Sequence, residues 1–360
     1  MHSIDSQMPL VRASEDAFVE GVTFCGTVTS LDSRKVYSGC IFEGVRWVGV
    51  NVDNVKFIGC SFVENVFDDV HLSNSIFQEV DFDGGVEFSG CRIDGNVFSG
   101  VVGAFLRLRS CHVFSNTWHD VVVDGLDFCG SFSQMNAWTE SQLRDIRIVD
   151  CQVRDESFAE LVCDSIGFIR SSLIRFMVGG LVAADASFKQ CAGEMVRFFK
   201  SNLECLALHD VEISQLSMTD CQLGAFSLQG GQAPLMMLQD SRVKKLNARN
   251  ASFDKLLLDG SMVGELEMES CAVRGGSLRG ARVGLFKANN CSWDDLDATD
   301  FVHEASNFNA VRVGRSKFPG HDRRSWPGVE FNKTDFSVGM SEAEIKWLRE
   351  FNNKNPELAC

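Results

Sequence analysis

The chain has 360 residues, of which 45% are apolar and 23% are charged, a composition typical of a folded protein with an apolar core. No segment reaches the roughly 18 consecutive apolar residues of a membrane helix, and the N-terminus lacks the features of a secretory signal. We therefore expect a cytoplasmic protein without a membrane span, although export independent of a signal peptide stays open. The formal net charge of −15 argues against direct binding to nucleic acid, whose phosphates require lysine and arginine.

Residues 1–35 show no regular spacing of apolar side chains, and we expect them to form an N-terminal cap or arm. From Phe42 onward, an apolar residue returns at every fifth position. One extra residue at Gly84 and Gly85 interrupts this spacing, which restarts at Phe88 and continues to Phe318. The first run consists of Phe42, Trp47, Val52, Phe57, Phe62, Phe67, Leu72, Phe77 and Phe82.

The repeating apolar position is called the centre here, and the residue two before it is called the slot. Across all centres and slots, Glu156 is the only charged residue, whereas the other three positions of each quintet carry nearly all the acids and bases. Neither a helix nor a strand has a period of five, because these repeat at 3.6 and 2.0 residues. A chain that turns a corner every five residues has this period, with centre and slot pointing inward.

The size of the slot residue varies with a longer period of twenty residues. Slots counted from Cys91 in steps of twenty are small, whereas those counted from Val86 are mostly large. Twenty residues make four quintets, so the pattern predicts a four-sided coil. The small slots are Cys91, Cys111, Ser131, Cys151, Ser171 and Cys191, and the large series is Val86, Leu106, Leu126, Ile146, Ile166, Ala186 and Leu206.

Nine of the fourteen cysteines occupy slots, and we interpret them as small buried residues in a reducing compartment, with redox sensing as the alternative. Asn96, Asn116 and Asn136 share one side of the coil and predict a ladder of amides. Glu156 lies twenty residues further and continues that ladder.

Several quintets resemble those of the pentapeptide-repeat family, in which a small residue and Asp or Asn precede a central Leu or Phe. The resemblance covers residues 36–338 and implies an all-β fold, a right-handed quadrilateral parallel β-helix, that is, a four-sided β-solenoid. The best matches are Thr334-Asp335-Phe336-Ser337, Val80-Asp81-Phe82-Asp83-Gly84, Ser201-Asn202-Leu203 and Ser306-Asn307-Phe308.

The C-terminal part of the sequence predicts a cover for the last coil. A loop insertion at about 319–328 precedes two further quintets at Phe331 and Phe336. Residues 339–360 are expected to form a capping helix and tail, because a capping box at 341–344 precedes apolar residues spaced by three. A helix that binds a partner is the alternative.

Two outward-facing groups of charges are candidate interaction surfaces. The acidic surface lies in a segment that has no lysine or arginine between Lys56 and Arg92, and the basic surface surrounds the loop insertion. The acidic surface is Glu64, Asp68, Asp69, Glu79, Asp81, Asp83 and Glu87, and the basic surface is Arg312, Arg315, Lys317, Arg323, Arg324 and Trp326.

The sequence predicts no catalytic constellation, cofactor or metal site, so we do not expect an enzyme. The leading hypothesis is a non-catalytic scaffold that binds another protein, and a secreted bacterial effector is one form of it. The family resemblance implies a second hypothesis, a DNA-mimicking modulator or protector of DNA gyrase or another type II topoisomerase. An accessory binding module of an enzyme system is the third. We expect a monomer or an end-to-end homodimer.

Overall fold

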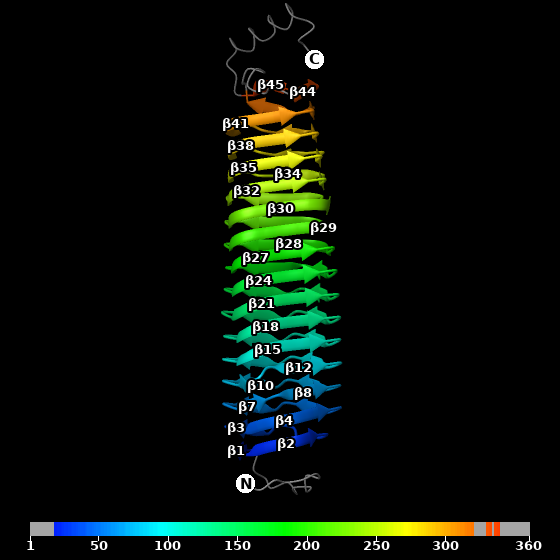
Figure 1. Ribbon diagram of the computed structural model, residues 1–360, viewed down its shortest axis with the longest axis vertical. Helices are drawn as coiled ribbons and strands as arrows, with labels where there is room; N and C mark the ends of the chain where they lie inside the picture. The colour runs from blue at the N-terminus through cyan, green and yellow to red at the C-terminus, as the bar shows by residue number, and fades with distance from the viewer. Residues whose placement is uncertain (1–17, 320–328, 333–334, 339–360) are drawn as a thin grey trace, which may run out of the picture. The chain divides into compact units, whose positions relative to one another are not determined.

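The computed structural model describes residues 18–319, 329–332 and 335–338, and the regular structure in these residues consists of β-strands (Figure 1). The chain divides into two compact units, Met1–Ser172 and Leu173–Cys360, called unit 1 and unit 2. Each is a parallel β-solenoid, and together they hold about 15 turns. The expectation of an all-β solenoid is confirmed for the described residues. Among them, no helix has the length and apolar character needed to cross a membrane.

The strands of unit 1 are mostly three or eight residues long. They are β1 (Phe18–Glu20), β2 (Thr23–Val28), β3 (Val36–Ser38), β4 (Ile41–Val48), β5 (Asn51–Asp53), β6 (Lys56–Ile58), β7 (Ser61–Val63), β8 (Asn65–Asp68), β9 (His71–Ser73), β10 (Ile76–Gln78), β11 (Asp81–Phe82), β12 (Val86–Ser89), β13 (Arg92–Asp94), β14 (Val97–Ser99), β15 (Val102–Arg109), β16 (His112–Phe114), β17 (Thr117–His119), β18 (Val122–Cys129), β19 (Phe132–Gln134), β20 (Ala137–Thr139), β21 (Gln142–Val149), β22 (Gln152–Arg154), β23 (Ser157–Ala159) and β24 (Val162–Ile169).

The remaining strands include the longest ones. They are β25 (Ser172–Ile174), β26 (Phe176–Gly179), β27 (Val182–Lys189), β28 (Ala192–Phe199), β29 (Asn202–Thr219), β30 (Gln222–Gln232), β31 (Leu235–Gln239), β32 (Arg242–Arg249), β33 (Ser252–Phe253), β34 (Lys255–Leu257), β35 (Met262–Glu269), β36 (Ala272–Val273), β37 (Gly276–Ser277), β38 (Arg282–Asn289), β39 (Ser292–Asp294), β40 (Leu296–Asp297), β41 (Val302–Asn309), β42 (Val311–Gly314), β43 (Lys317–Pro319), β44 (Val329–Asn332) and β45 (Asp335–Val338).

Parallel pairing joins each strand to the strand one coil further along the chain. In unit 1 the centre Phe98 of β14 pairs with Trp118 of β17, and in unit 2 Val243 of β32 pairs with Val263 of β35, in both cases at a separation of twenty residues. Across the glycine insertion the separation is twenty-one, as between Phe77 and Phe98. The predicted period is therefore confirmed within each unit, and the position of the insertion within unit 1.

The parallel pairing begins at Phe18, inside the segment expected to form an N-terminal cap or arm. β1 pairs with β3, and β2 pairs with β4, so that Phe24 lies beside Phe42. These partners are eighteen residues apart, and a β-bulge between Cys25 and Thr27 then shifts the register. The five-residue count fails there for this reason, which explains why the sequence pattern stopped short of these strands.

At the other end, β44 pairs with β42 and β45 with β43. Phe331 lies opposite the centre Val313, so the quintet predicted there after the loop insertion continues the ladder. The predicted capping helix at 339–360 and most of the loop at 319–328 lie outside the described residues.

The corners of the coil are of two kinds. At most corners one residue has a left-handed backbone, as Ser110, Ser115 and Asp120 do with φ of 52°, 53° and 52°. From Phe105 onward, one corner of each coil is extended instead, and strands such as β15 and β18 run through it, with pairing that skips only Ala104 and Asp124. Between Met195 and Lys255 in unit 2 a second corner is extended as well, whereas the same corner is left-handed at Arg175 and Asp295.

The extended corners account for the series of large slot residues that recurs every twenty residues. At the extended corners the ladder supplies a backbone partner for the slot N–H group, and the slots there hold large apolar residues such as Leu106 and Leu126. Small polar slot residues such as Ser131 follow left-handed corners, although apolar slots such as Val121 and Leu161 do so as well. Where the next coil has a small polar residue in the slot, the slot N–H group donates to its side chain, as Cys111 N does to Ser131 Oγ at 3.1 Å.

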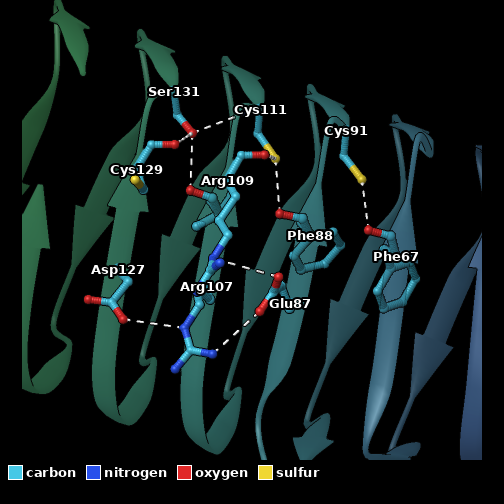
Figure 2. A network of polar contacts seen from close by, with 11 residues as sticks. Phe67, Glu87, Phe88, Cys91, Arg107, Arg109, Cys111, Asp127, Cys129 and Ser131 are labelled. Carbon is cyan, nitrogen blue, oxygen red and sulfur yellow. Dashed lines mark hydrogen bonds and ion pairs between the residues drawn. The ribbon is translucent and has the colours of Figure 1, made fainter. Parts of the chain in front are cut away.

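These slot side chains also donate hydrogen bonds to carbonyl groups of the coil below (Figure 2). Cys111 Sγ lies 3.3 Å from the carbonyl oxygen of Phe88, and Ser131 Oγ lies 3.1 Å from that of Leu108. A buried backbone group without a partner costs free energy, so these side chains complete the hydrogen bonding of the core. The interpretation of the slot cysteines as packing residues agrees with this role.

The asparagine ladder is confirmed. The amide nitrogens of Asn96, Asn116 and Asn136 donate in turn to Asn116, Asn136 and Glu156, at 3.0, 2.9 and 2.7 Å. On the same side the centres stack in an aromatic column, in which the rings of Phe98 and Trp118 are 3.8 Å apart. Unit 1 therefore has an interior that is closely filled on this side.

Candidate interaction surfaces

The acidic surface covers two adjacent faces of unit 1 and the corners that border them. Glu64, Asp69 and Glu79 lie at left-handed corners, with φ of 51°, 55° and 55°. Left-handed residues turn their side chains away from the ladder, and all three are exposed. The strands between the corners carry the other four acids, of which Asp81 and Asp83 are exposed and Asp68 and Glu87 are partly buried.

Arginines from neighbouring coils pair with part of this surface. Arg46 lies 3.2 Å from Asp68, and Arg107 and Arg109 lie 3.4 and 3.6 Å from Glu87. Arg107 also lies 3.4 Å from Asp127, so that it bridges two coils (Figure 2). The absence of bases between Lys56 and Arg92 in the sequence therefore does not leave the whole surface unpaired in space.

Five acids of the surface keep no ion pair with any residue that the structure describes. They are Glu64, Asp69, Glu79, Asp81 and Asp83, which are all exposed. A column of further acids, Asp120, Glu140 and Glu160, follows one corner of unit 1 at steps of twenty residues, again with left-handed φ of 52°, 50° and 55°. Sequence reasoning missed this column, although the twenty-residue spacing was the signal that could have found it.

The basic surface is described only in part. Arg315 donates from Nε to Asp294 Oδ1 at 3.2 Å, and this hydrogen bond holds the pKa of Asp294 below its usual value. Arg312 lies in β42 with an exposed side chain, and the backbone of Lys317 opens β43. Arg323, Arg324 and Trp326 lie outside the described residues. The proposed contact role of this surface stays a prediction.

Unit 2 carries a groove that sequence reasoning did not find. It has a volume of about 1310 Å³ and runs across consecutive coils between Asn202 and Glu304. The residues just before the centres form one wall, including Arg242, Met262 and Arg282. The residues just after the centres form the floor, where Gly224, Gly264 and Gly284 lie among the longer side chains of Glu204, Lys244 and Glu304. These glycines do not form a local sequence motif. They can be recognised only when residues twenty positions apart are compared.

In the part of the chain that the structure describes, no group of three or more His, Cys, Asp or Glu residues is placed to hold a metal ion. Thirteen described cysteines are free thiols, and ten of them are buried. Burial raises the pKa of the Cys151 thiol to about 11 and that of Cys163 to about 12.

No family model matches the chain, and no curated protein matches it significantly. Among solved structures, the chain is similar to HetL, a pentapeptide repeat protein involved in heterocyst differentiation regulation from the cyanobacterium Nostoc sp. strain PCC 7120. The match has 8% sequence identity and a TM-score of 0.18, and covers 78% of this chain and 87% of HetL.

Proposed function

We propose that the protein is a non-catalytic scaffold that binds another protein through the outward faces of its solenoid. We also propose that it is a divergent member of the pentapeptide-repeat family with a right-handed, quadrilateral coil. The five-residue register and the corner chemistry support this assignment. The cytoplasmic location, the option of signal-peptide-independent export, and the monomeric or end-to-end dimeric state belong to the same proposal.

One observation carries the scaffold function. Inward positions are occupied by side chains that fill the core or complete its hydrogen bonds, so only outward positions are free to act on other molecules. On the acidic surface Glu64, Asp81 and Asp83 are exposed and keep no ion pair in the described part of the chain. Charges of one sign gathered on a face attract a partner of opposite charge and steer its approach. A protein with a basic patch is the partner that this surface fits.

The acid column of unit 1 favours a second candidate, mimicry of DNA toward DNA gyrase or another type II topoisomerase. Asp120, Glu140 and Glu160 occur once per coil, so neighbouring acids of the column lie about 4.8 Å apart along the coil axis. None of them forms an ion pair with a cation among the described residues. Like charges this close oppose folding, so their retention is consistent with a binding role.

The experiment is an affinity capture followed by reconstitution with the purified partner. Binding to wild-type protein is compared with binding to Asp81→Lys/Asp83→Lys and to a control, Glu194→Lys/Glu212→Lys, which changes the charge equally at exposed positions of unit 2. We expect the acidic-surface variant to bind at least tenfold more weakly, and the control to bind as the wild type does. Equal affinity in all three proteins would contradict a role for the acidic surface.

Purified DNA gyrase tests the second candidate directly. Inhibition of supercoiling by wild-type protein that is lost in Asp120→Asn/Glu140→Gln/Glu160→Gln would support mimicry. Full supercoiling activity in the presence of excess wild-type protein would exclude gyrase as the target.

A further inference from the structure

The groove of unit 2 combines a low floor with unpaired cations. A Cβ atom added to Gly264 would lie 2.6 Å from the carbonyl oxygen of Lys244, and one added to Gly284 would lie 2.6 Å from that of Gly264. Side chains are therefore excluded from these floor positions by the backbone of the preceding coil. Their absence leaves the backbone open beside the taller wall, which another chain could approach closely.

The cations of the groove differ from most others in unit 2. Lys245 and Lys287 both pair with Glu265 and Glu267, and Arg249 pairs with Glu269 at 3.2 Å. By contrast, Arg242, Lys244 and Arg282 are exposed, and none of them forms an ion pair with a described residue. Three unpaired cations on one face of a chain with a net charge of −15 are available for an external anion.

The distance between the two arginines of the wall indicates which class of ligand could pair with both. Arg242 pairs with Met262, and Met262 pairs with Arg282, so the two arginines are two coils apart, about 9.6 Å. In a polyproline II segment every third residue lies on the same side, about 9.3 Å further along. Met262 stands between the arginines with 48% of its surface exposed, and can contact an apolar residue between two acids.

We propose that this groove binds an acidic polypeptide segment in an extended, polyproline II-like conformation, lying along the coil axis with carboxylates at every third residue. Two carboxylates pair with Arg242 and Arg282, and the glycine floor admits the backbone of the ligand. This inference rests on the proposed scaffold function and names a partner class for one face of unit 2. It is independent of the acidic surface of unit 1.

The test measures binding of two labelled peptides of equal composition to the full chain by fluorescence anisotropy. The probe is fluorescein-(Glu-Pro-Pro)4, and the comparison peptide has four consecutive glutamates followed by eight prolines. We expect the probe to bind at least fivefold more tightly than the comparison peptide. We expect Arg242→Ala/Arg282→Ala to weaken binding of the probe at least tenfold, and higher salt to weaken it as well.

The matched control is Arg197→Ala/Lys200→Ala, which removes two exposed cations of unit 2 outside the groove. It should bind the probe within twofold of the wild type, and both variants should keep the wild-type melting temperature. Equal loss of binding in the two variants, equal affinity for the two peptides, or no binding of the probe would each overturn the inference. The reconstitution with acidic-surface variants would still decide the scaffold function separately.

Discussion

The small polar residues in the slots of this solenoid complete hydrogen bonds of the buried backbone. Ser131 shows the rule, because its hydroxyl accepts from the buried N–H group of Cys111 and lies within hydrogen-bond distance of the carbonyls of Leu108 and Cys129. A cysteine at the equivalent slot, Cys91, makes the same contacts at slightly longer distances, with Val70 N at 3.4 Å and Phe67 O at 3.3 Å. Serine and cysteine therefore make the same kinds of hydrogen bond at these slots.

This rule predicts that Ser131→Ala is more damaging than Ser131→Cys. Alanine leaves the N–H group of Cys111 and a carbonyl without a partner in the core, which costs about 1–3 kcal/mol of unfolding free energy. Cysteine keeps a weak acceptor and donor, and should lose less than half as much. Urea unfolding of the two variants measures the difference. If both variants are equally stable, the slot side chains do not serve the backbone as described.

Glu156 is the residue that departs from the apolar interior. It is 2% exposed, and its Oε1 accepts hydrogen bonds at 2.7 Å from both Ser133 and Asn136, whereas Oε2 has no partner among the described residues. Burial raises the pKa of this carboxyl from its ordinary 4.5 to about 7, and the two hydrogen bonds oppose the rise. The sequence pattern identified this residue as exceptional but could not supply Ser133 as its second partner.

Stability should therefore fall as pH rises from about 4.5 to about 7, and change little above that from this group. A raised pKa means that the folded state binds the proton more tightly, so the contribution is complete below the unfolded pKa and is lost as the carboxyl ionises. The loss is about 3 kcal/mol. Glu156→Gln should be more stable than the wild type at pH 8, with a smaller difference between pH 5 and pH 8. Equal pH dependence in the variant and the wild type, measured by urea unfolding, would count against this account.

At the scale of strands and corners, the glycine insertion marks a change of corner type. Gly85 has φ of 84°, and its open side is covered by the ring of Phe105, which a Cβ atom at Gly85 would approach to 2.4 Å. Phe105 is also the first extended corner, and its ring lies 4.3 Å from the guanidinium of Arg107. The sequence showed the insertion as a one-residue shift of the five-residue register. It did not show why glycine is required there, because the ring of Phe105 comes from the next coil.

Gly85→Ala should destabilise the protein more than Gly90→Ala does. Gly90 has φ of 63° and open space around a built Cβ, so alanine there costs only the left-handed backbone penalty of about 1–2 kcal/mol. At Gly85 alanine carries the same backbone penalty and must also displace the ring of Phe105, which adds to the loss of stability. Thermal melting of both variants tests this expectation, and a smaller effect at Gly85 would contradict the observed packing.

At the scale of the whole chain, the sequence predicted the coil better than the surfaces. Inward positions repeat because each must fill the same interior, so their pattern can be read from one sequence. Outward partners depend on which residues meet one coil away, as Arg107 meets Glu87 and Asp127. The groove of unit 2 depends on the same spatial meeting of residues, since its wall and floor combine positions from successive coils.

The division into inward and outward positions is the central claim, and labelling of the native thiols tests it most directly. Cys25 and Cys129 are exposed, whereas slot cysteines such as Cys111 and Cys271 are buried. Timed alkylation followed by peptide mass spectrometry should therefore modify Cys25 and Cys129 quickly, and the slot cysteines only after unfolding by urea. Modification of Cys111 and Cys271 in the native protein at the rate of Cys129 would contradict the claim.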